Sequence, residues 1–98
     1  MVYFIREEGT HNVKVGYSSC PSNRAYDLQC GNSRELILEA QAAGDRCKEQ
    51  LIQEYLRDNG KHVRGEWYKM TKKAVRELMS IKPFTFNNLK ECFEREED

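Results

Sequence analysis

Net charge is the first thing that this sequence lacks. Its 98 residues carry 16 lysines and arginines against 16 aspartates and glutamates, so the formal net charge is zero. Proteins that bind DNA mainly by releasing counterions from phosphates usually carry a basic excess. Tight autonomous binding to long DNA is therefore disfavoured, and any basic surface must be local.

Long apolar runs and metal-type cysteine clusters are also missing. No stretch is long and apolar enough to span a bilayer, and the N-terminus shows no signal-peptide pattern. The four cysteines, Cys20, Cys30, Cys47 and Cys92, form no C-x-x-C pair, so we expect reduced, mostly buried thiols. These absences favour a cytoplasmic protein, or a nuclear one in a eukaryotic host, with no membrane partner.

The common catalytic signatures are absent as well. The chain has no phosphate-binding glycine loop, no G-x-S-x-G motif and no H-E-x-x-H motif. Its two histidines, His11 and His62, lie far apart in the sequence. A histidine-dependent hydrolase therefore has no specific support.

What is present is the pattern of one small α+β domain. The β-rich runs 2–6 and 13–17 predict a hairpin in which Tyr3 faces Tyr17, whereas a shift of one residue would place Tyr3 beside Gly16. In the first register, one face of the sheet would carry Tyr3, Ile5, Val13, Val15 and Tyr17.

The rest of the chain predicts helices and two further strands. In order, we expect a helix over 21–29, a strand over 36–43, a helix capped by Asp45 and ended at Asn59-Gly60, a loop and short strand over 62–70, a helix capped by Thr71, and a last short helix from about Asn87 that packs Leu89, Cys92 and Phe93. Residues 1–80 would form the functional part of the domain, and 81–98 its C-terminal short helix and acidic tail.

Candidate chemistry gathers at the open end of the predicted hairpin. Tyr3 and Tyr17 would meet there, and the helix that carries Arg24 begins a few residues further on. A phenol can hydrogen-bond an attacking water or accept its proton, and an arginine can hold phosphate oxygens. A distant carboxylate such as Glu66 can anchor Mg²⁺ together with waters and substrate phosphate. Taken singly, each residue is more often a packing tyrosine or a solvated surface charge.

Five short motifs, in order and at fitting spacings, resemble the GIY-YIG endonucleases over Val2 to about Leu78. They are Met1-Val2-Tyr3, Lys14-Val15-Gly16, the segment Tyr17 to Arg24, Leu28-Gln29-Cys30-Gly31-Asn32, and Gly65-Glu66-Trp67-Tyr68. The last two look like motifs of a phage- and virus-associated branch of that superfamily.

The resemblance implies a three-stranded antiparallel sheet flanked by helices, and cleavage of DNA with one Mg²⁺ or Mn²⁺ ion. By position, Tyr3 would activate or position the water, Arg24 would hold the scissile phosphate, and Glu66 would bind the metal. Gly16 would allow close approach of backbone or substrate. Lys14 stands where the family has a tyrosine, and Tyr17 is the nearby phenol that would replace it.

Three functions stay open from the sequence. The first is a divalent-metal-dependent DNA endonuclease that uses Tyr3, Tyr17, Arg24 and Glu66. The second is a binding-only nucleic-acid module, and the third is a protein-interaction domain, which the neutral charge and acidic tail would suit. A second copy or a partner protein would supply specificity. The residues expected to bind nucleic acid are Lys14, Gly16, Arg24, Lys61 and Arg64.

Overall fold

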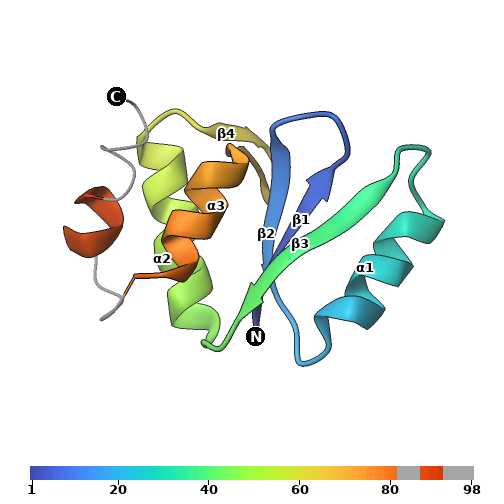
Figure 1. The fold of residues 1–98 in the computed structure, drawn as a ribbon, viewed down its shortest axis with the longest axis horizontal. Coiled ribbons are helices and arrows are strands. Elements are labelled where there is room, and N and C mark those ends of the chain that lie inside the picture. Colours follow the sequence, from blue (N-terminus) through green and yellow to red (C-terminus); the bar gives the residue numbers. More distant parts are fainter. Residues whose placement is uncertain (82–86, 92–98) are drawn as a thin grey trace.

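A computed structural model describes residues 1–81 and 87–91, and it shows a mixed sheet-and-helix domain (Figure 1). Its elements are β1 (Val2–Glu7), β2 (Asn12–Tyr17), α1 (Pro21–Cys30), β3 (Leu36–Ala42), α2 (Arg46–Asp58), β4 (His62–Arg64), β5 (Trp67–Lys69) and α3 (Lys72–Met79). A further helical segment covers residues 87–91. The α+β class and most of the predicted element positions are thereby confirmed.

The sheet has five antiparallel strands in the order β3-β1-β2-β5-β4, so the expected count of three strands is wrong. The two extra strands come from residues 62–69, where β4 and β5 form a hairpin and β5 pairs with β2. Gly65 turns this hairpin with a φ of 51°, a conformation that side chains larger than hydrogen rarely adopt. The short strand predicted within 62–70 is present as β5. The three residues of β4 lie where a loop was expected, because so short a strand shows no clear alternation in the sequence.

The first hairpin adopts the second of the two registers that the sequence allowed, with Tyr3 beside Gly16, and not the first. Val2 pairs with Tyr17 and Tyr3 pairs with Gly16, one residue away from a Tyr3–Tyr17 pair. Alternation along the strands therefore places Tyr3, Ile5, Lys14 and Gly16 on one face and Val2, Phe4, Val13, Val15 and Tyr17 on the other. We call the first the α1 face and the second the α2–α3 face.

The α2–α3 face carries the main hydrophobic core. In Figure 1 the sheet lies between α1 on one side and α2 with α3 on the other. Asp45 and Thr71 cap α2 and α3 as predicted, each accepting a hydrogen bond from a backbone N–H three residues on. The core contains Val2, Phe4, Val13, Val15, Ile52, Tyr55, Leu56, Tyr68, Met70, Ala74, Val75, Leu78 and Leu89.

Arg6 is a buried charge at the centre of this architecture, with only 3% of its surface exposed. Its Nε and Nη2 atoms donate to the two carboxylate oxygens of Glu39 on β3, each at 2.8 Å. Nη1 donates to the carbonyl oxygens of Thr10 and Met70 at 3.1 and 2.7 Å. One guanidinium thus joins β1 to β3, to the first hairpin loop and to the segment before α3.

The expectation of buried thiols is wrong for three cysteines. Cys20, Cys30 and Cys47 are free and exposed, because α1 buries little beyond Pro21 and Cys47 lies in the solvent-facing first turn of α2. Cys92, Phe93 and the acidic tail lie outside the described residues. Within residues 1–81 and 87–91, no helix is long and apolar enough to cross a membrane.

Candidate functional site

Tyr3 and Gly16 form the base of a polar cluster on the α1 face. Tyr3 is 3% exposed, and its ring lies directly across Gly16 on the neighbouring strand. A Cβ atom at position 16 would overlap the Tyr3 ring and hydroxyl. The glycine is therefore required by the close packing of the tyrosine, and the position of the phenol is fixed by the sheet.

Arg24 reaches this phenol from α1. Burial raises the pKa of Tyr3 above its usual value, while a hydrogen bond from the Arg24 side chain and its positive charge act in the opposite direction. The negative charges of Glu66 and Glu49 raise the pKa of Tyr3 further. Side chains from β1, α1, α2 and the β4–β5 turn therefore share one electrostatic environment.

Glu66 lies in the β4–β5 turn and is held by two different elements. Its Oε1 is 3.4 Å from the Nζ atom of Lys14 on β2, and its Oε2 accepts a hydrogen bond from Gln53 Nε2 at 3.2 Å. The backbone carbonyl of Glu66 accepts from Val15 N at 3.1 Å. The carboxylate is half-exposed, with 45% of its side chain accessible, so it is positioned by the fold and open to a ligand.

Helix α2 contributes two residues that sequence reasoning missed. Glu49 and Gln53 are 7% and 8% exposed, and they lie four residues apart on one side of the helix. Gln53 Nε2 also donates to the carbonyl of Val15 at 2.8 Å, where β2 extends beyond its pairing with β5. Burial raises the pKa of Glu49, and the charge of Glu66 raises it further. The only sequence signal was a pair of polar residues at helical spacing beside the apolar stripe.

Tyr17 does not join the cluster. The observed register turns it toward the α2–α3 face, where the guanidinium of Arg46 lies 5.2 Å from its ring centroid. Lys14 lies on the opposite face, beside Glu66, so Tyr17 does not replace the family tyrosine whose position Lys14 occupies. A catalytic role for Tyr17 therefore has no geometric support.

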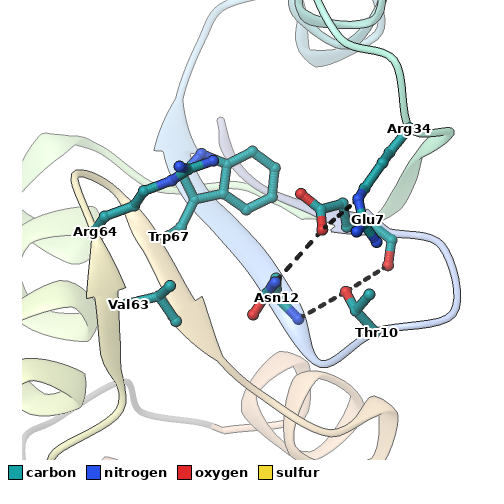
Figure 2. Close-up of a pocket in the computed structure, with 7 residues that line it drawn as sticks. All are labelled: Glu7, Thr10, Asn12, Arg34, Val63, Arg64 and Trp67. Carbon is teal, nitrogen blue, oxygen red and sulfur yellow. Dashed lines mark hydrogen bonds and ion pairs between the residues drawn. The ribbon is translucent and has the colours of Figure 1, made fainter.

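The remaining predicted nucleic-acid contacts lie along the β4–β5 hairpin. Arg64 is exposed and borders a pocket with Trp67, and Figure 2 shows both side chains above the sheet. The Nζ atom of Lys14 lies 5.9 Å from the centroid of the Trp67 ring, which links this pocket to Glu66. Lys61 is half-buried before β4, and its backbone bonds Leu56 and Lys69.

The donor set can be tested against the Mg²⁺ or Mn²⁺ ion that the resemblance implies. The described part of the chain holds no group of three or more histidine, cysteine or acidic side chains suited to a metal. Mg²⁺, however, commonly binds through one or two carboxylates with waters and substrate phosphates. Glu66 and Glu49 are two carboxylates close enough for the charge of one to raise the pKa of the other. They are the candidate ligands for an ion that substrate would complete, and Glu66 would have to release Lys14 to bind it.

The fold and this cluster define a small α+β domain in which a phenol packs on a glycine of the central hairpin. A guanidinium and two carboxylates act on the pKa of that phenol. The family model of the T5orf172 domain matches residues 1–81, and the chain belongs to this family, which is related to the GIY-YIG nucleases. No curated protein and no solved structure gives a significant match. The relation inferred from the motifs is thus confirmed at the level of the superfamily, while the phage- and virus-associated branch stays a prediction.

Proposed function

We propose that this domain is a divalent-metal-dependent endonuclease that hydrolyses DNA phosphodiester bonds. The observation that carries the proposal is the convergence of three side chains from separate segments: Arg24 on α1 hydrogen-bonds the phenol of Tyr3 on β1, and the charge of Glu66 in the β4–β5 turn acts on the pKa of that phenol. Family membership supports it, because the T5orf172 family is related to the GIY-YIG nucleases.

Each side chain has a distinct task in this proposal. Arg24 holds the scissile phosphate through its paired N–H donors and offsets charge that develops on the phosphate oxygens. Glu66 and Glu49 hold the divalent ion, which when bound supplies positive charge to the phosphate and the attacking water. Water adds to phosphorus, the bond to the leaving oxygen breaks, and a proton passes to that oxygen.

Tyr3 acts as a positioning donor rather than as a base. Burial raises the pKa of its phenol, so the hydroxyl keeps its proton at neutral pH. A protonated phenol donates a hydrogen bond to a phosphate oxygen or holds the attacking water through its oxygen. The ring packed on Gly16 fixes where that hydrogen bond forms.

The test compares two tyrosines that undergo the same change. Tyr3→Phe removes only the hydroxyl, and we expect metal-dependent cleavage of plasmid DNA to fall at least about tenfold. Tyr26→Phe is the matched control, because Tyr26 lies on α1 and is 72% exposed. Equal cleavage by both variants would exclude Tyr3 from the reaction.

A binding-only domain is the second candidate, and one contact favours it. Lys14 places an ammonium 3.4 Å from Glu66, so the carboxylate already has a cationic partner where an ion would bind. This candidate predicts salt-sensitive nucleic-acid binding in EDTA and no cleavage with Mg²⁺ or Mn²⁺. Metal-dependent cleavage that depends on Glu66 would exclude it.

A further inference from the structure

A second recess lies on the α1 face, beyond the polar cluster and toward the first hairpin loop. Its volume is about 490 Å³, within the range of pockets that hold small ligands. Figure 2 shows side chains from β1, β2, the β4–β5 hairpin and the segment before β3 around it. The lining residues are Glu7, Thr10, Asn12, Arg34, Val63, Arg64 and Trp67.

Trp67 provides an aromatic wall to this pocket. It is half-buried on β5 and pairs with Lys14, so its indole lies on the same face of the sheet as the polar cluster. Arg64 beside it is exposed, and the Lys14 ammonium lies 5.9 Å from the ring centroid. An aromatic ring flanked by cations is the arrangement on which unpaired nucleobases stack while their phosphates are neutralised.

The opposite wall offers hydrogen-bonding groups. Glu7 Oε1 accepts a hydrogen bond from Asn12 Nδ2 at 3.4 Å and lies 3.8 Å from Arg34 Nε, as Figure 2 shows. Both contacts use Oε1, and a carboxylate has further acceptor positions on its second oxygen. Asn12 carries an amide that both donates and accepts. Such groups pair with the edge of a base that is not already paired with another base.

The position of the pocket relative to the cluster sets what can occupy it. Lys14 contacts Glu66 on one side and Trp67 on the other, so the two sites are neighbours on the α1 face. A strand whose phosphate reached Arg24 and Glu66 would bring an adjacent nucleotide toward Trp67. In an intact duplex that base would be stacked and paired, and it could not enter the recess.

We propose that this pocket binds one unpaired nucleobase, so that the substrate is single-stranded or locally opened DNA rather than intact duplex. This inference rests on the proposed nuclease function for the role of the neighbouring cluster. The base stacks on Trp67, Arg64 holds a flanking phosphate, and Glu7 with Asn12 contacts the base edge.

Trp67 is the single tryptophan of the chain, so its fluorescence reports on binding at or beside this pocket. The experiment titrates an eight-nucleotide single strand, or a duplex of the same sequence, into the protein in EDTA. We expect saturable quenching by the single strand and at least about fivefold weaker binding of the duplex, the lower end of the effect of one stacked base. Equal quenching by both forms, or no quenching by the single strand, would overturn the proposal.

Two arginine variants keep the fluorophore and locate the binding surface. Arg64→Ala should weaken binding of the single strand at least about threefold, because a phosphate contact is lost. Arg76→Ala is the matched control, since Arg76 is exposed on α3 and covers the opposite face of the sheet. Equal weakening by the two variants would also overturn the proposal.

The measurement separates this inference from the nuclease function. Because EDTA removes the metal, quenching does not depend on cleavage. A protein that cuts plasmid DNA without quenching of Trp67 contradicts the pocket alone. Quenching by the single strand without any metal-dependent cleavage contradicts the nuclease function alone.

Discussion

The contact between Tyr3 and Gly16 decides the geometry of the site at the scale of single residues. Cross-strand partners in a sheet lie close enough for one side chain to occupy the space of the other. The absence of a side chain at position 16 lets the Tyr3 ring lie over β2 and present its hydroxyl to Arg24. The family motif that contains Gly16 therefore has a packing reason within this chain.

Gly16→Ala should destabilise the fold by about 1–3 kcal/mol, since the new methyl group would overlap a buried ring. Urea unfolding followed by circular dichroism measures this difference. Gly31→Ala is the control, because a Cβ there would meet no atom closer than 4.0 Å. If the two variants had equal unfolding midpoints, the close packing of Tyr3 on Gly16 would be wrong.

Glu49 gives a prediction about pH. Burial, and then the charge of Glu66, raise its pKa above the unfolded value, so the folded state binds the proton more tightly. Ionised Glu49 therefore costs stability, and the cost grows as pH rises from the ordinary carboxyl pKa through the raised one. Glu49→Gln, which resembles the protonated form, should be more stable than the parent at pH 7, with a smaller difference at pH 4.

Urea unfolding at the two pH values tests this, with Glu54→Gln as the control on the same helix. Glu54 is exposed, so its replacement should change stability little at either pH. The prediction would be wrong if the stability gained by Glu49→Gln over the parent were smaller at pH 7 than at pH 4.

Arg6 connects elements rather than single residues. Its two hydrogen bonds to Glu39 fix β1 beside β3, where the pairing shifts between Phe4 and Ile5. Its hydrogen bonds to the carbonyl oxygens of Thr10 and Met70 hold the first hairpin loop and the segment before α3 against β1. Because the guanidinium is buried and donates four hydrogen bonds, the loss of either partner leaves polar groups without compensation.

Arg6→Ala should lower the free energy of unfolding by about 3–5 kcal/mol, the usual cost of breaking a buried ion pair. Lys73→Ala removes an exposed partner that lies 3.9 Å from Glu77 and should change stability by less than about 1 kcal/mol. Chemical denaturation compares the two variants. Similar losses in both would show that Arg6 is no more than a surface charge.

The sequence predicted elements better than it predicted their arrangement. The starts of α2 and α3 could be predicted because Asp45 and Thr71 are capping residues in front of apolar stripes. The hairpin register could not be predicted, because residues Val2 to Ile5 are apolar on both faces of β1 and alternation therefore gives no preference. Of the two short strands, the one expected within 62–70 is present as β5, whereas β4 was too short to detect and lies where a loop was expected.

The residues of the candidate site could likewise be predicted only in part. The motif residues Tyr3, Lys14, Gly16 and Glu66 lie on or beside one face, but the register error placed Tyr17 with them. Glu49 and Gln53 were missed because buried polar residues on an amphipathic helix resemble its solvated side. Their partners lie on β2 and in the β4–β5 turn, and only tertiary structure brings these segments together.

At the scale of the whole molecule, zero net charge limits how tightly nucleic acid can bind. Three exposed arginines, Arg24, Arg34 and Arg64, lie at the cluster or the pocket. Three phosphate contacts on a single strand, each contributing about 0.7, give a slope of about −2 for log affinity against log salt concentration. Fluorescence anisotropy of a labelled strand at several salt concentrations measures this slope. A slope near zero, or one several times steeper, would place the binding surface elsewhere.

The most direct test of the central claim is nicking of supercoiled plasmid by the purified protein with Mg²⁺ or Mn²⁺, beside Glu66→Gln and Glu54→Gln. Both variants remove one negative charge, but only Glu66 belongs to the cluster with Lys14 and Gln53. We predict nicking that requires metal, disappears in Glu66→Gln and persists in Glu54→Gln. Metal-independent nicking, no nicking by the parent protein, or undiminished nicking by Glu66→Gln would contradict the assignment of this site as a metal-dependent nuclease.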